Sequence, residues 1–143
     1  MKGKPQIART GVVVLALAAL AVPGSQALAE KTNFHVRPSI KMKRTEGQDK
    51  LSGKLRSNAN ACAEGRKVKL LHRPVQQKER WSVLAKLRTN GKGKWTFLAR
   101  KNPNGDRYAT PGNYHVKVGE ARVNTGGREI TCKEKFSSSI FVG

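Results

Sequence analysis

Residues 81–100, WSVLAKLRTNGKGKWTFLAR, decide the fold class. Two runs in which apolar and polar residues alternate, 81–88 and 94–100, flank the dipeptide Asn90-Gly91. Alternation with a period of two is typical of a strand with one buried face. Asn-Gly between two such runs is a strong hairpin signal. The stretch therefore predicts two strands joined by a tight turn, with Trp81 and Trp95 in the core.

The same alternation recurs along the rest of the chain. Further turn signals, Asn104-Gly105 and Pro111-Gly112, separate the stretches, and little helical pattern is present after the first 30 residues. Seven or so short strands with turns about every 8–12 residues predict an all-β domain, folded as an Ig-like β-sandwich. Tyr114 is expected in its core together with the two tryptophans. The remaining expected strand regions are 34–43, 50–56, 67–73, 114–118 and 130–142.

The N-terminus carries the three parts of a secretory signal peptide. Basic residues precede an uncharged apolar run at 11–22, and small residues follow at 27–29. The alternative is a membrane anchor, but this run is shorter than the roughly 20 residues that span a bilayer as a helix. We therefore predict a cleaved signal helix over 1–29, a single β-sandwich domain over 30–143, and a secreted protein, extracellular or cell-wall associated. The basic residues are Lys2, Lys4 and Arg9.

Two cysteines, Cys62 and Cys132, follow the signal. An exported protein meets oxidising conditions in which disulfides persist, and two cysteines allow one pairing. We predict the bridge Cys62–Cys132; the alternative is a pair of buried free thiols. A structural zinc site needs about four ligands, so the cysteines do not predict a metal site.

The chain is strongly basic, with 29 Lys and Arg against nine Asp and Glu and a net charge of +20. Removal of the signal takes three basic residues and no acidic ones, which leaves +17 on 114 residues. Charge of this density favours anionic partners. Basic residues occupy the polar positions of the expected strands, whereas acidic residues lie mostly in expected loops. Positive charge is therefore expected on both outer faces of the sandwich.

Strand alternation directs seven basic side chains outward as candidate anion-binding residues. Solvent exposure explains their polarity but not their sign, since Asp and Glu would serve equally well. The expected partners are an anionic polysaccharide, teichoic acid or another polyanion, including lipid headgroups. Nucleic acid remains a possible partner without a supporting motif. The seven residues are Lys54, Arg56, Lys67, Lys69, Lys86, Arg88 and Lys117.

Four motifs in the middle of the chain suggest a family. In order they are LSGKL at 51–55, GRKVKLL at 65–71, TNGKGKWTF at 89–97 and PGNYHVKV at 111–118. Over roughly residues 50–118 the chain resembles the carboxypeptidase-regulatory-like and transthyretin-like (prealbumin-like) sandwich modules of bacteria. The resemblance implies a seven-stranded Greek-key sandwich with a non-catalytic, accessory or binding role. Asn90 stands where that family usually has Asp, and the cysteine pair is not part of its general pattern.

We find no catalytic constellation in the sequence. His35, His72 and His115 lie in separate expected strands without metal-ligand spacing, and the serines at 137–139 lack the glycines of a nucleophile elbow. No Asp-x-Asp run suggests calcium. A non-enzymatic protein without cofactor or metal is therefore expected, with no transmembrane segment after signal cleavage.

Three functions remain open. The leading hypothesis is a secreted, non-enzymatic sandwich that binds an anionic envelope polymer or surface. The alternative is a structural or protein-partner module without a polyanion ligand, whose charge serves only solubility. The third is an enzyme of unrecognised type. Salt separates the first two, because counterion release makes polyanion binding fall steeply with salt concentration.

Overall fold

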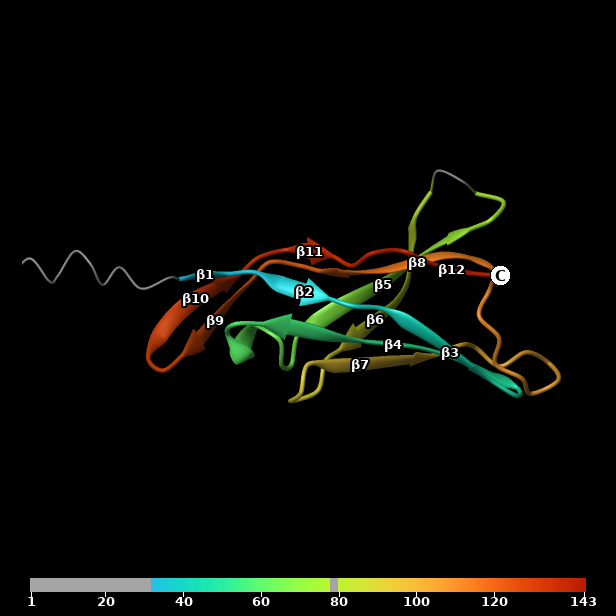
Figure 1. Cartoon of the computed structure of the whole chain (residues 1–143), viewed down its shortest axis with the longest axis horizontal. Helices are drawn as coiled ribbons and strands as arrows, with labels where there is room; N and C mark the ends of the chain where they lie inside the picture. The colour runs from blue at the N-terminus through green and yellow to red at the C-terminus, as the bar shows by residue number, and fades with distance from the viewer. Residues whose placement is uncertain (1–31, 78–79) are drawn as a thin grey trace, which may run out of the picture. The chain divides into compact units, whose positions relative to one another are not determined.

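The computed structural model describes residues 32–77 and 80–143, and the predicted signal peptide lies outside the described residues. The described chain is all-β, as predicted. Its strands form several sheets, two of which lie as layers in Figure 1, and its one helical element is the 3₁₀ turn η1 (Asn60–Cys62). These two layers give the molecule its sandwich character.

The first sheet is built around the long strand β4 (Gln48–Ser57). One edge of β4 pairs with β2 (Val36–Pro38) and then with β3 (Lys41–Thr45), and the other edge pairs with β7 (Lys94–Leu98), all antiparallel. β2 and β3 thus form one interrupted edge strand. Pro38 ends β2, which suits an edge because proline has no N–H to donate to the ladder.

The second sheet has β5 (Lys67–Pro74) and β8 (Gly112–Val118) at its centre. β6 (Ser82–Arg88) pairs with the free edge of β5, and β11 (Lys135–Phe136) and β12 (Ile140–Val142) share the free edge of β8. All of these pairings are antiparallel.

A third, smaller sheet was not expected from the sequence. β9 (Ala121–Thr125) and β10 (Arg128–Cys132) form a hairpin, and β1 (Asn33–Phe34) runs parallel to β10. The turn residues Gly126 and Gly127 have φ of 57° and 76°, the left-handed conformation that two-residue hairpin loops require. Figure 1 shows this hairpin at the end of the molecule away from the C-terminus. The Gly-Gly dipeptide was the signal in the sequence that could have revealed it.

The core lies between the first two sheets and is filled by the inward-facing residues of both. Trp95 and Tyr114 are buried there, as predicted, at 2% and 1% exposure. The first sheet adds Leu51 and Leu55, and the second adds alternate residues of β5 and β8. Burying one face of each sheet drives the sandwich together, because apolar surface removed from water is the main favourable term in folding.

The predicted turn at Asn90 is present, but it does not form a hairpin. It connects β6 in the second sheet to β7 in the first. The side-chain Oδ1 of Asn90 accepts hydrogen bonds from the N–H groups of Lys92 and Lys94, both at 2.9 Å. The positive φ in this turn is at Gly93, not at Gly91. A two-residue hairpin loop would need positive φ at Asn90 and Gly91, so this turn redirects the chain between the layers.

The prediction that Trp81 is a core residue is wrong. The register between β5 and β6 shifts between Leu70 and Leu71: Leu70 pairs with Ala85 but Leu71 pairs with Val83. Leu84 is therefore an extra residue, and such a bulge turns the following side chains to the other face. Trp81 and Val83 consequently point to the outer face, and Val83 is 48% exposed.

Candidate anion-binding surface

Five of the seven predicted anion-binding residues lie on the outer face of the second sheet. Lys86, Lys69 and Lys117 are cross-strand neighbours in one row, and Lys67 pairs with Arg88 in the next row. Adjacent strands are about 4.8 Å apart, so these side chains emerge close to one another. We call this set, Lys67, Lys69, Lys86, Arg88 and Lys117, the five-cation cluster.

Little negative charge lies within the five-cation cluster. Lys117 Nζ is 3.3 Å from the Glu134 carboxylate, and this is the one ion pair that involves the cluster within residues 32–77 and 80–143. Arg88 Nη1 donates a hydrogen bond to the backbone carbonyl of Gly65 at 2.7 Å. Lys67, Lys69, Lys86 and Arg88 are exposed. The cluster therefore presents positive charge to solvent, and Lys117 is its one member that forms an ion pair within the described residues.

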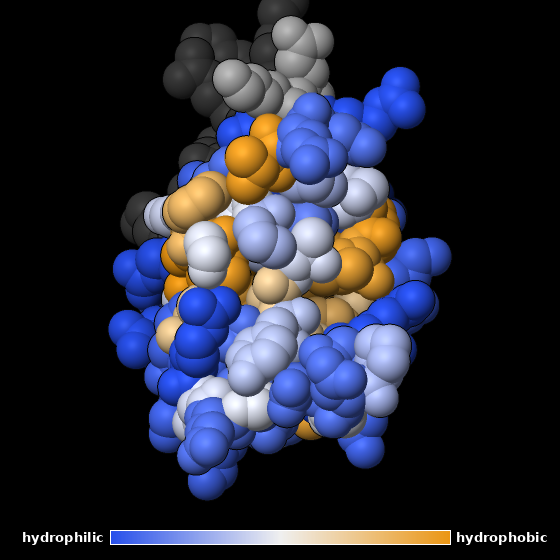
Figure 2. Space-filling view, turned by 90° about the vertical axis from the view of Figure 1, so that its right-hand side faces the viewer, coloured by the Kyte–Doolittle hydropathy of each residue, from blue (hydrophilic) through white to orange (hydrophobic). Residues whose placement is uncertain are grey.

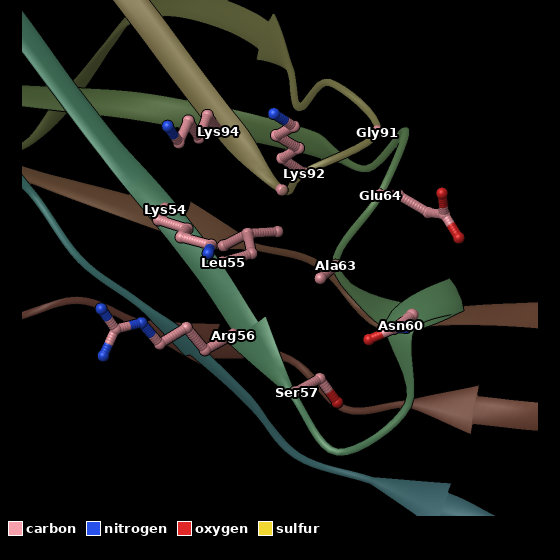
Figure 3. Close-up of a pocket in the computed structure, with 11 residues that line it drawn as sticks. Lys54, Leu55, Arg56, Ser57, Asn60, Ala63, Glu64, Gly91, Lys92 and Lys94 are labelled. Carbon is pink, nitrogen blue, oxygen red and sulfur yellow. The ribbon is translucent and has the colours of Figure 1, made fainter.

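The remaining two predicted residues, Lys54 and Arg56, belong to the first sheet. They line a shallow groove of about 450 Å³ between the end of β4 and the 90–94 turn, to which Lys92 and Lys94 also contribute. Figure 3 shows Glu64 at the rim with its carboxylate pointing away from these four cations. The structure thus divides the predicted residues between two separate basic surfaces, and five of the seven lie in the five-cation cluster.

Like charges face each other across strands throughout both sheets. Such cross-strand pairs are destabilising when both partners carry the same sign, and Asp or Glu at one position of each pair would remove the repulsion. The pairs are Lys67–Arg88, Lys69–Lys86, Lys69–Lys117, Lys54–Lys94, Lys43–Lys50 and Arg37–Arg56.

An aromatic group borders the five-cation cluster on the same outer face. The ring of Trp81 stacks on His115 with centroids 3.9 Å apart, and Phe136 meets His115 edge-on at 5.4 Å. The guanidinium of Arg73 lies 4.8 Å from the centre of the Trp81 ring, and Lys117 Nζ lies 5.2 Å from that of Phe136. Sequence reasoning missed this group because only the bulge at Leu84 places Trp81 outside.

His115 is enclosed by this aromatic group. Its Nε2 atom is buried and has no hydrogen-bond partner among the described residues. Burial, and secondarily the charge of Arg73, lower the pKa of His115 below its ordinary value. The imidazole is therefore biased toward its neutral form, which suits a ring that serves as a stacking surface.

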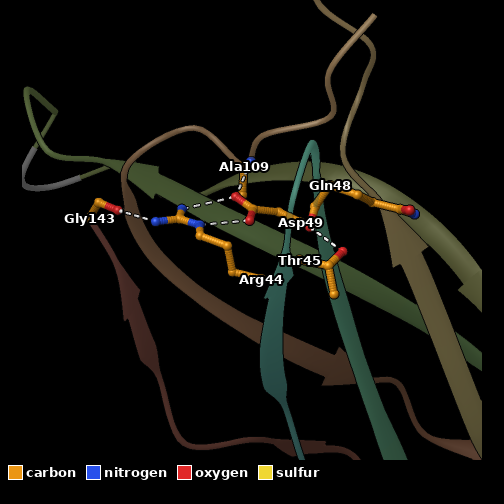
Figure 4. A network of polar contacts seen from close by, with 6 residues as sticks. All are labelled: Arg44, Thr45, Gln48, Asp49, Ala109 and Gly143. Carbon is orange, nitrogen blue, oxygen red and sulfur yellow. Dashed lines mark hydrogen bonds and ion pairs between the residues drawn. The ribbon is translucent and has the colours of Figure 1, made fainter.

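A polar network at the other end of the first sheet has a structural role. Asp49 is fully buried and accepts hydrogen bonds from Arg44 at 2.8 and 3.0 Å and from the N–H of Ala109 at 2.8 Å (Figure 4). Arg44 also donates to the carbonyl of Gly143. The network ties the β3–β4 hairpin to the loop before β8 and to the C-terminus. The Asp49 carboxylate accepts three hydrogen bonds within this network.

The predicted disulfide pair is present. Cys62 Sγ and Cys132 Sγ are 2.00 Å apart, and both residues are fully buried. The bond joins η1, on the connection between the two main sheets, to the end of β10 in the third sheet. A disulfide is compatible with an extracellular location.

Two further observations concern the described residues. No three His, Cys, Asp or Glu side chains lie close enough together there to hold a metal ion. No helix in residues 32–77 or 80–143 has the length and apolar character needed to cross a membrane.

No family model, curated protein or solved structure matches this chain.

Proposed function

We propose that the protein is a secreted, non-enzymatic β-sandwich that binds an anionic polymer or surface through the five-cation cluster. The observation that supports this most is the row Lys86–Lys69–Lys117, in which three like charges stand on adjacent strands. Such a row costs stability. Surface charge for solubility does not require three like charges on adjacent strands, whereas such a row is complementary to a polyanion that lies across the strands.

We also propose the finer features of the fold. When β2 with β3, and β11 with β12, are each counted as one interrupted strand, the two main sheets contain three and four strands. The chain crosses between these sheets after β4, β6 and β7. This supports a seven-stranded Greek-key sandwich and is in keeping with the resemblance to carboxypeptidase-regulatory-like modules. The motifs of residues 50–118 support that resemblance.

The test is retention of the mature protein on a heparin column under a salt gradient. The protein for this test is isolated from culture medium. Its intact mass should be that of a chain that begins at Glu30, which checks the predicted removal of the signal peptide. Replacing Lys67, Lys69 and Lys86 with Glu should move elution to clearly lower salt, because each lost contact with a sulfate or carboxylate of heparin weakens binding.

The matched control reverses Lys41, Lys43 and Lys50 to Glu. These exposed residues lie on the first sheet, and their reversal changes the net charge by the same amount. If both variants elute at the same salt concentration, retention reports net charge alone. The alternative, a structural or protein-partner module whose charge serves solubility, would then be preferred.

A further inference from the structure

Exposed hydrophobic residues are concentrated on the sheet that carries the five-cation cluster. Among the residues described, seven large hydrophobic side chains are exposed, and five of them belong to this sheet or its border. Phe141 is 64% exposed and Phe136 is 45% exposed. The five are Val75, Val83, Leu84, Phe136 and Phe141; the other two, Leu98 and Tyr108, lie outside this sheet.

Strand pairing makes these residues neighbours. Leu71 pairs with Val83 on one side and with His115 on the other, and His115 lies between Trp81 and Phe136. Farther along the strands, Val75, Arg73 and Phe141 line one shallow depression of about 290 Å³. Figure 2, which views the end of the molecule where β12 lies, shows apolar side chains at the surface between hydrophilic ones. The outer face of the second sheet thus has a basic half and an apolar half.

We propose that this face binds a lipid bilayer that carries anionic headgroups. The five-cation cluster and Arg73 would contact the headgroup phosphates, and Trp81, Phe136, Phe141 and Val83 would enter the interfacial layer. This inference rests on the proposed function and names the ligand of the same surface. Basic residues beside exposed aromatic and aliphatic ones are the combination by which peripheral proteins hold an anionic membrane.

Charge and apolar exposure together favour a membrane over a dissolved polyanion. A hydrated polysaccharide or a teichoic acid satisfies the cations but provides no apolar medium for Val83, Leu84 and Phe141. Exposed apolar surface rimmed by polar residues marks an interaction site for a membrane or a protein. A bilayer meets both halves of the face at once, because its anionic headgroups and its acyl region lie in adjacent layers.

The experiment measures binding of the mature protein to vesicles of phosphatidylcholine, alone or mixed with phosphatidylglycerol. We expect cosedimentation only with the anionic vesicles. Trp95 is buried in the core, so quenching by brominated acyl chains would report the other tryptophan, Trp81. The variant Phe136→Ser/Phe141→Ser should bind these vesicles about tenfold more weakly or worse, because each ring loses apolar burial. Its retention on heparin should be unchanged.

The matched control is Leu98→Ser/Tyr108→Ser, which removes two exposed hydrophobic residues away from this face and should change vesicle binding less than twofold. Val83→Ser serves as a second test variant if the phenylalanine variant has a lowered melting temperature. Retention on heparin without binding to anionic vesicles would overturn the membrane inference and leave polyanion binding intact. Vesicle binding that is insensitive to the phenylalanines, or an equal loss on heparin, would also overturn it. If the protein neither is retained on heparin nor binds anionic vesicles, the proposed function itself is contradicted.

Discussion

Asp49 is a buried carboxylate in a chain with a large excess of positive charge. The hydrogen bonds from Arg44 are the main cause of a pKa of Asp49 below its ordinary value; burial acts in the opposite direction, and the Ala109 N–H lowers the pKa further. The carboxylate is therefore ionised in the folded protein at neutral pH. It fixes the β3–β4 hairpin to the loop that precedes β8.

We expect Asp49→Asn to lower the free energy of unfolding at pH 7 by about 1.5–3 kcal/mol, the usual range for hydrogen bonds to a charged group. Because the folded pKa of Asp49 is depressed, its contribution is present above the unfolded pKa and is lost as pH falls through the folded pKa. Urea titrations at pH 7 and at pH 2–3 should show the difference between wild type and variant shrinking in acid. The control is Glu129→Gln, which removes an exposed pair with Arg122. A variant as stable as this control at pH 7 would contradict the assignment.

The alternation of apolar and polar residues predicted burial well along uninterrupted strands and poorly where the strand register changes. Trp95 and Tyr114 occupy the core because uninterrupted alternation connects them to their neighbours. Trp81 does not, because the bulge at Leu84 reverses the parity of everything before it on the strand. A bulge depends on the partner strand, which a single alternating run does not reveal.

At the scale of elements, one contact holds β4 and β7 in register. Gly53 pairs with Trp95, and a Cβ at Gly53 would lie 2.7 Å from the indole ring. The same Cβ would overlap the backbone carbonyl oxygen of Ser39. The missing side chain of Gly53 is therefore what allows the Trp95 ring to pack closely against the middle of β4.

Gly53→Ala should destabilise the protein by about 3 kcal/mol, the upper part of the usual range for overpacking, because the Ser39 carbonyl belongs to the backbone and cannot move without disturbing the β2–β4 edge. Thermal unfolding followed by circular dichroism measures the effect. Gly91→Ala is the matched control, since a Cβ at Gly91 would meet nothing within 4 Å and its φ is not positive. Equal melting temperatures for the two variants would show that the pairing of Gly53 with Trp95 is not as close as described.

Most strands of the two main sheets could be predicted from the sequence, but their partners could not, and β9 of the third sheet was missed. The runs at 81–88 and 94–100 both became strands, yet they belong to different sheets. Asn-Gly marks a turn, and the geometry of that turn depends on hydrogen bonds from Lys92 and Lys94 to the Asn90 side chain. Likewise, strand alternation predicted which basic side chains point outward, but it could not show that five of them lie on one face of one sheet.

At the scale of the whole molecule, the chain must hold together against its own charge. A net charge of +17 on the predicted mature domain opposes compaction through self-repulsion, and like-charged pairs lie across both main sheets. The third sheet pairs with neither main sheet. The disulfide supplies a covalent link between that sheet and the connection at η1.

Replacing Cys62 and Cys132 together with Ala should therefore lower stability markedly. The bond closes a loop with a sequence separation of 70, and chain entropy assigns about 4 kcal/mol to a loop of that length. For a domain of about 110 residues such a loss lowers the melting temperature by well over ten degrees. The loss should be larger at low salt, where repulsion among the basic residues is least screened.

Dithiothreitol provides the control: it should lower the melting temperature of the wild type toward that of the double variant and leave the variant unchanged. Two titratable thiols in the denatured, unreduced wild type would show that the bridge does not form.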